Sequence, residues 1–321
     1  TELHVVVAPD GPEEILAHLN DGLRAFGSTF GNPSVVLMQA LGAAVSRHVP
    51  ICLAGDGGDE LFGGYPRYQA AAIFGAWQSV PGFIRRKMAG NIARLLPRGG
   101  ARFVRGGQGD AQRAFQYWND RCGLAELGAR LVVPEDLSEG DLCDQMMAFD
   151  RRVTLPGNQL AMSDRCGMAY GLEYRVPLLG HDVMAIAGRV AARGHLREGA
   201  KSLLRAAIAQ MMPDGYLRAS KVGFNPPVAD WLAKLGGLLW GREARIIEML
   251  FADLPIRDRT RQDYWRRATR HGEQDMALGL WALIVWRIWQ MHLATDRRAE
   301  IMRAKGSVDG SIKAVVQEVV Q

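Results

Sequence analysis

The stretch LAGDGGDELFGGYPRY, from Leu53 to Tyr68, decides how this chain is interpreted. It contains five glycines and three carboxylates, and the carboxylates are Asp56, Asp59 and Glu60. Glycines let backbone N–H groups approach an anion because no Cβ stands in the way, so glycine-rich loops commonly cradle phosphates. Carboxylates repel phosphates, and a loop that combines both residue types therefore needs an explanation.

A divalent metal ion between protein and phosphate explains the combination. Mg²⁺ uses few protein carboxylates and takes its other oxygen ligands from phosphates and water. Asp59 is then the residue that holds Mg²⁺, while Gly55, Gly57 and Gly58 allow the backbone to approach the phosphate. The alternatives are a calcium-binding loop and a solvent-exposed turn. The spacing of the acids does not match an EF-hand, and no Gly/Asp repeat is present.

The residues before this loop alternate between strand and helix patterns. Residues 3–8 form a short β-branched run that predicts a strand, and the apolar spacing over residues 12–26 predicts a helix. Ser34 is the expected N-cap of a second helix that ends near His48. Residues 49–55, VPICLAG, predict a buried strand that pairs in parallel with the first one. The acidic loop follows the carboxyl end of that strand, where open α/β sheets bind ligands.

The chain beyond Tyr68 is mostly helical in pattern as far as His292. Its most apolar segment, MALGLWALIVWRIWQMHL, is interrupted by Arg287 and Gln290, so it predicts a buried core helix and not a membrane span. We assign residues 1–296 to one α/β domain with a large helical C-terminal part, and residues 297–321 to a C-terminal tail. The chain begins with Thr1 and not with Met, which we interpret as a sign that an upstream part has been removed.

The composition is that of an ordinary globular protein, with 48% apolar and 23% charged residues among 321. The formal net charge is +5, but the basic residues are spread in short pairs, which indicates solvated surface, with a mild attraction for anionic substrates as the alternative. The four cysteines form no CxxC pair, which argues against a zinc site and suits a reducing cytoplasm. We therefore expect a cytoplasmic protein that binds neither nucleic acid nor a membrane.

Five segments, in the same order, resemble the asparagine synthetase family of the glutamine-hydrolysing kind. The stretch from Leu53 to Tyr68 resembles the family segment SG(D/E)GxDE-FGGY. The other four segments are FGNPSVVLMQAL, SDRCGMAYGLEYRVPLL, GAKSLLRAA and LRASKVGFNPPVADWL. Together they cover roughly residues 1–290. The resemblance implies an adenine-nucleotide-hydrolase-like parallel sheet, here truncated at its N-terminal side.

The resemblance also implies a two-step ligase reaction. The side-chain carboxylate of aspartate, or another carboxylate substrate, attacks the α-phosphate of ATP and forms an acyl-adenylate and pyrophosphate. Ammonia, released from glutamine by a separate glutaminase domain upstream, then displaces AMP. A carboxylate and a triphosphate are both anionic, so Mg²⁺ and a lysine are expected to neutralise the departing pyrophosphate.

Residue roles follow from position in the matching segments. The catalytic residues implied are Asp56, Lys221, Asp164 and Arg165. The nucleotide-binding residues implied are Ala54, Gly55, Gly57 and Gly58. Asp59 and Glu60 are assigned to the metal, with Glu60 either supporting Asp59 or complementing the N-terminus of a helix. We predict that Asp56 and Lys221 enter one cleft. Glu173 and Arg175 are either substrate contacts or, as we prefer, a buried ion network.

Parts of the family pattern are absent from this sequence. The ATP-binding loop Ser-Gly-Gly-x-Asp-Ser is not found, and RGGQGDAQR, residues 105–113, has the wrong order. Gly180 stands where the family usually has Asp, and LPGNQL, residues 155–160, stands where it often has two acids. We therefore expect an incomplete chain that is inactive in isolation.

Three functions remain open at this point. The first is the synthetase portion of a glutamine-dependent asparagine synthetase, or of a close amidotransferase relative that amidates another carboxylate. The second is a relative that closes a β-lactam or macrolactam ring. The third is a non-catalytic scaffold or partner subunit that retained the fold after losing the ATP-binding loop. The oligomeric state stays open between a monomer and a homodimer.

Overall fold

The computed structural model describes residues 3–93, 95–128, 130–137, 139–212, 224–239, 243–254, 256–269 and 274–304. The α-helices in these ranges are α1 (Pro12–Phe26), α2 (Ser34–Val45), α3 (Gly58–Phe62), α4 (Pro66–Ala72), α5 (Phe74–Gln78), α6 (Gly82–Lys87), α7 (Arg98–Gly106), α8 (Ala111–Asn119), α9 (Leu142–Phe149), α10 (Ala161–Met168), α11 (His181–Gly188), α12 (Ser202–Ile208), α13 (Val228–Leu239), α14 (Glu243–Phe251), α15 (Asp258–Thr269) and α16 (Gln274–Ala304). The strands are β1 (Ile51–Leu53) and β2 (Glu173–Arg175). The π-helices are η1 (Met88–Ile92) and η4 (Asp150–Leu160), and the short 3-10 helices are η2 (Leu124–Leu127), η3 (Glu135–Leu137), η5 (Pro177–Leu179) and η6 (Ala192–Leu196).

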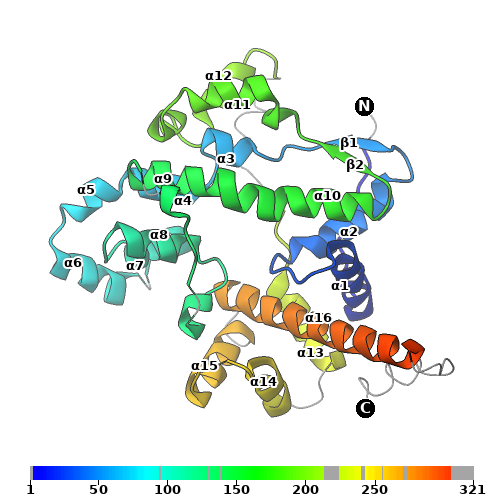
Figure 1. Ribbon diagram of the computed structural model, residues 1–321. Coiled ribbons are helices and arrows are strands. Elements are labelled where there is room, and N and C mark those ends of the chain that lie inside the picture. The colour runs from blue at the N-terminus through cyan, green and yellow to red at the C-terminus, as the bar shows by residue number, and fades with distance from the viewer. Residues whose placement is uncertain are drawn as a thin grey trace.

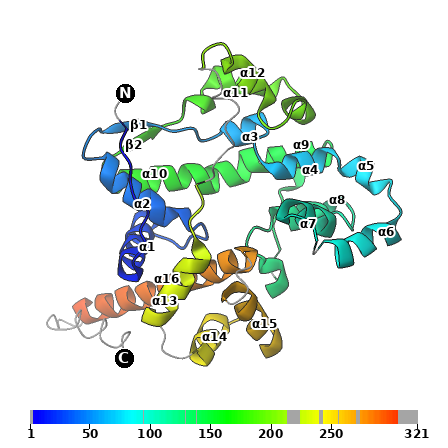
Figure 2. The same ribbon diagram turned by 180° about the vertical axis from the view of Figure 1, so that it is seen from behind.

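A continuous helical rod, made of α9, η4 and α10, crosses the middle of the molecule (Figure 1). The sheet, α3, α11 and α12 lie on one side of it, and α1, α2 and α13 to α16 lie on the other (Figures 1 and 2). The central part of the rod is an eleven-residue π-helix that contains Pro156. Proline removes a backbone donor, and π-helical turns occur frequently at functional sites.

The two strands pair in parallel, with Ile51 opposite Glu173 and Leu53 opposite Arg175. An α/β architecture with a parallel sheet is thus confirmed in its coarse form, although the described sheet has only these two strands. The expectation that β1 is buried is wrong, because Ile51 is 41% exposed and Leu53 is 71% exposed.

The predicted strand over residues 3–8 is wrong. These residues form no hydrogen-bonded strand, and the partner of β1 is β2, about 120 residues later in the chain. A strand needs hydrogen bonds to a neighbouring strand, and a short β-branched run alone does not supply that neighbour. Leu3 and Val7 are accordingly 86% and 84% exposed.

The two predicted N-terminal helices are present. Helix α1 buries Ile15, Leu19 and Leu23, spaced four residues apart, which is the pattern of a helix with one apolar face. The predicted role of Ser34 as an N-cap is wrong. Ser34 is the first helical residue of α2, and the Asn32 side chain accepts a hydrogen bond from its backbone N–H.

The largest apolar core lies under α16, where Leu280, Trp281 and Ile284 are buried in one cluster with residues of α1, α13 and α15. This confirms the prediction of a buried core helix in that segment. A second apolar core joins α4, α8 and α9 on the other end of the rod. Among the described residues, no helix is long and apolar enough to cross a membrane.

Candidate active site

The acidic loop begins directly after β1 and turns into α3 through Gly57, whose φ is +86°. A side chain at Gly57 is excluded twice, because that backbone conformation favours glycine and because a Cβ would lie 2.2 Å from Cδ2 of Leu179. The residues of η5 therefore pack directly on the turn. This fixes the direction in which α3 leaves the carboxyl end of β1.

Asp56 lies at the turn and is held from the central rod. The hydroxyl Oγ of Ser163, on α10, donates a hydrogen bond of 2.8 Å to Oδ2 of Asp56. Ser163 is 6% exposed, while Asp56 is half-buried. The structure thus gives Asp56 a defined orientation beside the rod while keeping part of it accessible.

Asp59, in the first turn of α3, forms an ion pair with Lys201, with 3.0 Å between Nζ and Oδ1. Both side chains are mostly covered, since Lys201 is 25% exposed and Asp59 is 20% exposed. Gly64 is required for this arrangement, because a Cβ there would lie 1.7 Å from Oδ1 of Asp59 and 2.5 Å from Cε of Lys201. The second glycine of the FGGY segment therefore makes room for an ion pair.

Lys201 has an unusual backbone conformation. Its φ is +58°, and it is the one non-glycine residue with a positive φ among the described residues. A left-handed conformation costs a residue with a Cβ about 1–2 kcal/mol. Such strain persists where the surrounding structure enforces it, which is frequent at functional sites. Lys201 immediately precedes α12, and in this backbone conformation its ammonium reaches the acidic loop before α3.

Glu60 points into the interior and not into the loop. It is 2% exposed, and its Oε1 accepts hydrogen bonds from the Tyr65 hydroxyl and from Nε2 of Gln159, the latter at 3.2 Å. Burial raises the pKa of Glu60 above its ordinary value. Of the two roles considered for Glu60, this geometry favours support of the loop from the rod over complementing the helix N-terminus.

A buried ion pair lies beside Glu60. Nη2 of Arg67 and the hydroxyl of Tyr68 both donate to Oδ2 of Asp150, at 2.5 Å each. The Arg67 guanidinium also lies 4.2 Å from the centre of the Tyr65 ring. Asp150 starts the π-helix, so these contacts attach the segment after the acidic loop to the central rod. No charge pattern in the sequence predicts this pair.

The four predicted nucleotide-binding residues lie together at the carboxyl end of β1. The N–H of Ala54 donates to the Arg175 carbonyl at 2.8 Å, so it extends the sheet and is not available to a ligand. The N–H of Gly58 donates to the Gly55 carbonyl at 3.3 Å and closes the turn. A Cβ at Gly55 would meet no atom within 4 Å, so Gly55 is the member of this group with open space beside it.

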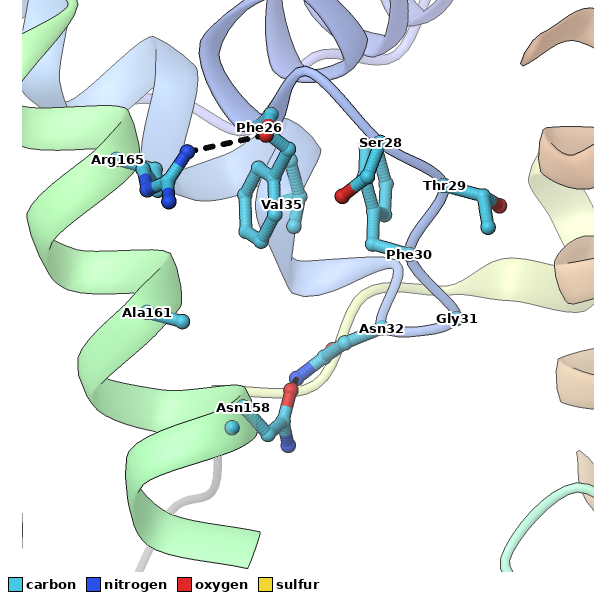
Figure 3. Close-up of a pocket in the computed structure, with 11 residues that line it drawn as sticks. Phe26, Ser28, Thr29, Phe30, Gly31, Asn32, Val35, Asn158, Ala161 and Arg165 are labelled. Carbon is cyan, nitrogen blue, oxygen red and sulfur yellow. Dashed lines mark hydrogen bonds between the residues drawn. The ribbon is translucent and has the colours of Figure 1, made fainter.

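The predicted catalytic residues Asp164 and Arg165 follow Ser163 on α10, and both are exposed. Nη1 of Arg165 donates to the Phe26 carbonyl at 3.0 Å (Figure 3). Residues 161 and 165 lie on the face of α10 opposite Ser163, because each is two residues, or about 200°, away along the helix. The structure therefore places Arg165 and Asp56 on opposite sides of the rod.

A cavity of about 420 Å³ lies on the Arg165 side. Its rim is the loop between α1 and α2, and its floor is the junction of η4 and α10 (Figure 3). Nδ2 of Asn32 donates to Oδ1 of Asn158 across it at 3.0 Å. The residues that line it are Phe26, Ser28, Thr29, Phe30, Gly31, Asn32, Val35, Gly157, Asn158, Ala161 and Arg165.

Lys221 lies outside the described residues, so its predicted approach to Asp56 stays a prediction. The chain is described again from Phe224, whose carbonyl accepts a hydrogen bond of 3.0 Å from Oγ of Ser34. Pro226 is buried. The segment that follows Lys221 is thus attached to the start of α2, next to the cavity.

The preferred interpretation of Glu173 and Arg175 as a buried ion network is wrong. They pair with each other along β2, with 2.9 Å between Nε of Arg175 and Oε1 of Glu173. Both side chains are more than half exposed. Side chains two residues apart lie on the same face of a strand, and here that face is open. An exposed pair of this kind contributes little to stability.

The donor set fits a magnesium ion that is shared with phosphate better than a metal ion bound by protein alone. In the described part of the chain, no three His, Cys, Asp or Glu side chains are grouped to hold a metal. Mg²⁺ commonly takes only one or two carboxylates when phosphates complete its ligands. Asp59 is the carboxylate expected in this role, and it would share its charge with Lys201.

The family model for asparagine synthase matches residues 4–293. The chain belongs to the asparagine synthase family. A relative from Mycobacterium tuberculosis (strain H37Rv), named as a putative asparagine synthetase (glutamine-hydrolyzing), is 25% identical over 304 residues, which cover 86% of this chain and 44% of the relative. Asparagine synthetase (glutamine-hydrolyzing) 1 from Bacillus subtilis (strain 168) is 26% identical over 240 residues, which cover 69% of this chain and 38% of the relative.

The chain spans less than half the length of these curated asparagine synthetase relatives. The family membership confirms the resemblance that the motifs indicated. Within the site, Lys201 is the residue whose role sequence reasoning missed. The available signal was its place in the GAKSLLRAA segment, which matched the family but carried no visible partner, since Asp59 is 142 residues away.

Proposed function

We propose that this chain is the synthetase portion of an ATP-dependent amide-forming ligase. In the proposed reaction, a substrate carboxylate attacks the α-phosphate of ATP, pyrophosphate leaves, and ammonia then replaces AMP to form the amide. The observation that supports this most strongly is the acidic glycine loop at the carboxyl end of β1, with Asp59 paired to Lys201. Membership of the asparagine synthase family supports the same reaction class.

The charges of the loop suit a reaction in which pyrophosphate leaves. Lys201 provides a mostly covered ammonium at the loop, and electrostatic stabilisation is strongest where water is largely excluded. Asp59 is the residue that would hold Mg²⁺, and the ion when bound would neutralise phosphate charge. Asp56, oriented by Ser163, is the residue proposed to lie beside the carboxylate that is activated.

We further propose that the chain acts together with an upstream ATP-binding loop and a glutaminase domain. The relatives that match this chain are more than twice as long as the part it covers. The exposed Leu53 and Ile51 of β1 suit a sheet that other strands extend. Under this proposal residues 1–321 alone bind ATP weakly and turn over no ATP.

A second candidate function is the same reaction with a carboxylate substrate other than aspartate. LPGNQL, where the family often has two acids, contributes Gly157 and Asn158 to the cavity, whose lining residues include no carboxylate. An α-ammonium group is bound best beside a carboxylate, so a cavity of this composition favours an acceptor other than aspartate if the acceptor binds there. Comparing a panel of amino-acid and peptide carboxylates as substrates would separate the two candidates.

The test of the proposed function uses Asp59→Asn in the complete gene product. The variant removes one negative charge while retaining the size of the side chain. We expect Mg²⁺-dependent pyrophosphate release to fall more than about tenfold, or about 1.4 kcal/mol of transition-state stabilisation. The matched control is Asp10→Asn, because Asp10 also pairs with a lysine, Lys234, but at an exposed site. Unchanged pyrophosphate release in Asp59→Asn would contradict the proposal.

A further inference from the structure

A long segment of the chain carries positive charge without any negative charge. Residues 61–109 contain eight Lys and Arg residues and neither Asp nor Glu. The formal net charge of the whole chain is +5, so the remaining residues carry −3. Basic residues elsewhere occur as short pairs among acids. The fold neutralises two of these cations, because Arg67 pairs with Asp150 and Arg102 pairs with Asp275. The exposed Arg86 and Lys87 are therefore among the cations that give this segment its surface charge.

The same segment exposes large apolar side chains. Phe83 and Ile84 on α6 are 67% and 37% exposed, Ile92 on η1 is 39% exposed, and Leu95 is 84% exposed. Single exposed apolar residues are normal, whereas exposed apolar groups beside polar ones are typical of interaction sites. These four side chains fall within thirteen residues of sequence. Helices α5 and α6 lie at the outer edge of the molecule in both views (Figures 1 and 2).

The orientation of α6 is set by Arg85. Nη1 of Arg85 donates to the carbonyls of Gly107 and Gly109, at 3.2 and 3.4 Å, so this side chain is turned toward the body of the protein. The next residues, Arg86 and Lys87, are exposed. Phe83 and Ile84, on the other side of Arg85 in sequence, are exposed with them. One short helix therefore presents both apolar and cationic side chains to the solvent.

We propose that the surface formed by α6, η1 and Leu95 is a peripheral docking site for an anionic membrane surface. The cations match the negative headgroups, and the apolar side chains at the edge of the molecule can enter the headgroup boundary. A nucleic acid would match the charge but would leave Ile84, Ile92 and Leu95 in contact with a polar backbone. This proposal departs from our expectation that the chain has no membrane partner, and it is independent of the proposed function.

The test is sedimentation of the protein with lipid vesicles. One set of vesicles contains phosphatidylcholine alone, and the other contains about 30% phosphatidylserine, which supplies the negative surface potential. We expect the protein to sediment with the phosphatidylserine vesicles, and to do so less as the salt concentration rises. Equal sedimentation with both kinds of vesicle would overturn the proposal.

Two double variants separate the contribution of charge to vesicle binding from that of the apolar side chains. Arg86→Glu with Lys87→Glu, and Phe83→Ser with Leu95→Ser, should each weaken vesicle binding at least about tenfold. The matched control is Ile186→Ser with Arg189→Glu on and after α11, where Ile186 is 58% exposed and Arg189 is also exposed. It should bind vesicles like the unchanged protein.

Two results would overturn the assignment. One is wild-type vesicle binding by both double variants. The other is a concentration-dependent dimer, seen by sedimentation velocity without lipid, that Phe83→Ser with Leu95→Ser converts to a monomer. That second result would assign the surface to another copy of this chain. Circular dichroism of each variant checks that these exposed substitutions leave the helical content unchanged.

Discussion

Glu60 shows how a residue in an acidic loop can serve structure and not ligand binding. It is 2% exposed and accepts hydrogen bonds from Tyr65 and Gln159. Its neighbour Asp59 instead reaches Lys201. Adjacent residues on a helix point about 100° apart, so one faces the interior and the other faces the loop. Glu60 therefore supports the loop from the interior, whereas Asp59 faces the candidate site.

Burial of Glu60 predicts a pH dependence of stability. Because burial raises its pKa in the folded protein, its stabilising contribution is fully present below pH 4.5, its ordinary pKa, and is lost as the pH rises through the higher folded value. Glu60→Gln keeps the acceptor but does not titrate. We expect the free energy of unfolding of Glu60→Gln to improve relative to that of the unchanged protein as the pH rises from 4.5 to neutral.

Denaturant unfolding at several pH values measures this difference. The exposed Glu198→Gln is the control, and it should show no comparable trend. The free energy of unfolding of Glu60→Gln is compared with that of the unchanged protein at each pH. If this difference stays constant with pH, the interior location of Glu60 does not control its ionisation.

Residue roles were only partly predictable from the sequence. The acidic loop and its position after a strand were predicted because glycines and carboxylates in one short segment have few chemical explanations. Lys201 was missed because an isolated lysine carries no local signal of its partner. Glu173 and Arg175 were misinterpreted because charge in a family motif does not reveal whether the side chains face the interior or solvent.

At the scale of elements, the turn between β1 and α3 depends on one backbone conformation. Gly57 has a φ of +86° and packs against Leu179, whereas Gly55 has open space beside it. We expect Gly57→Ala to lower the free energy of unfolding by about 2–4 kcal/mol, from the left-handed backbone and the steric overlap together. Gly55→Ala should lower it by less than about 1 kcal/mol.

Thermal or denaturant unfolding of both variants compares two alanine substitutions two residues apart. Equal destabilisation would mean that the turn tolerates a side chain at Gly57, and that the loop is not fixed by its glycines in the way described.

Element prediction succeeded where periodicity and burial agreed. Helix α1 and the central part of α16 show apolar residues at helical spacing, and both bury those residues. The strand predicted over residues 3–8 failed because, within the described residues, its β-branched run has no strand beside it with which to pair. Strand β2 was missed because Glu173, Tyr174 and Arg175 form a polar three-residue run that lacks an apolar strand pattern.

At the scale of the whole molecule, the chain contains the acidic glycine loop but no Ser-Gly-Gly-x-Asp-Ser segment. The relatives extend well beyond the matched region. We therefore expect residues 1–321 alone to show no micromolar ATP binding by isothermal titration calorimetry with Mg²⁺ present. Micromolar binding would contradict the proposal that the site is completed by another segment.

The reaction class is tested most directly by the products formed from ATP. The complete gene product, supplied with ATP, Mg²⁺, ammonia and a carboxylate substrate, should release AMP and pyrophosphate in equal amounts, each matching the amide formed. Quantifying AMP, ADP, phosphate and pyrophosphate in one chromatographic run measures this. Release of ADP and phosphate in place of AMP and pyrophosphate would contradict the account, because the acidic loop would then not serve an adenylate-forming ligase.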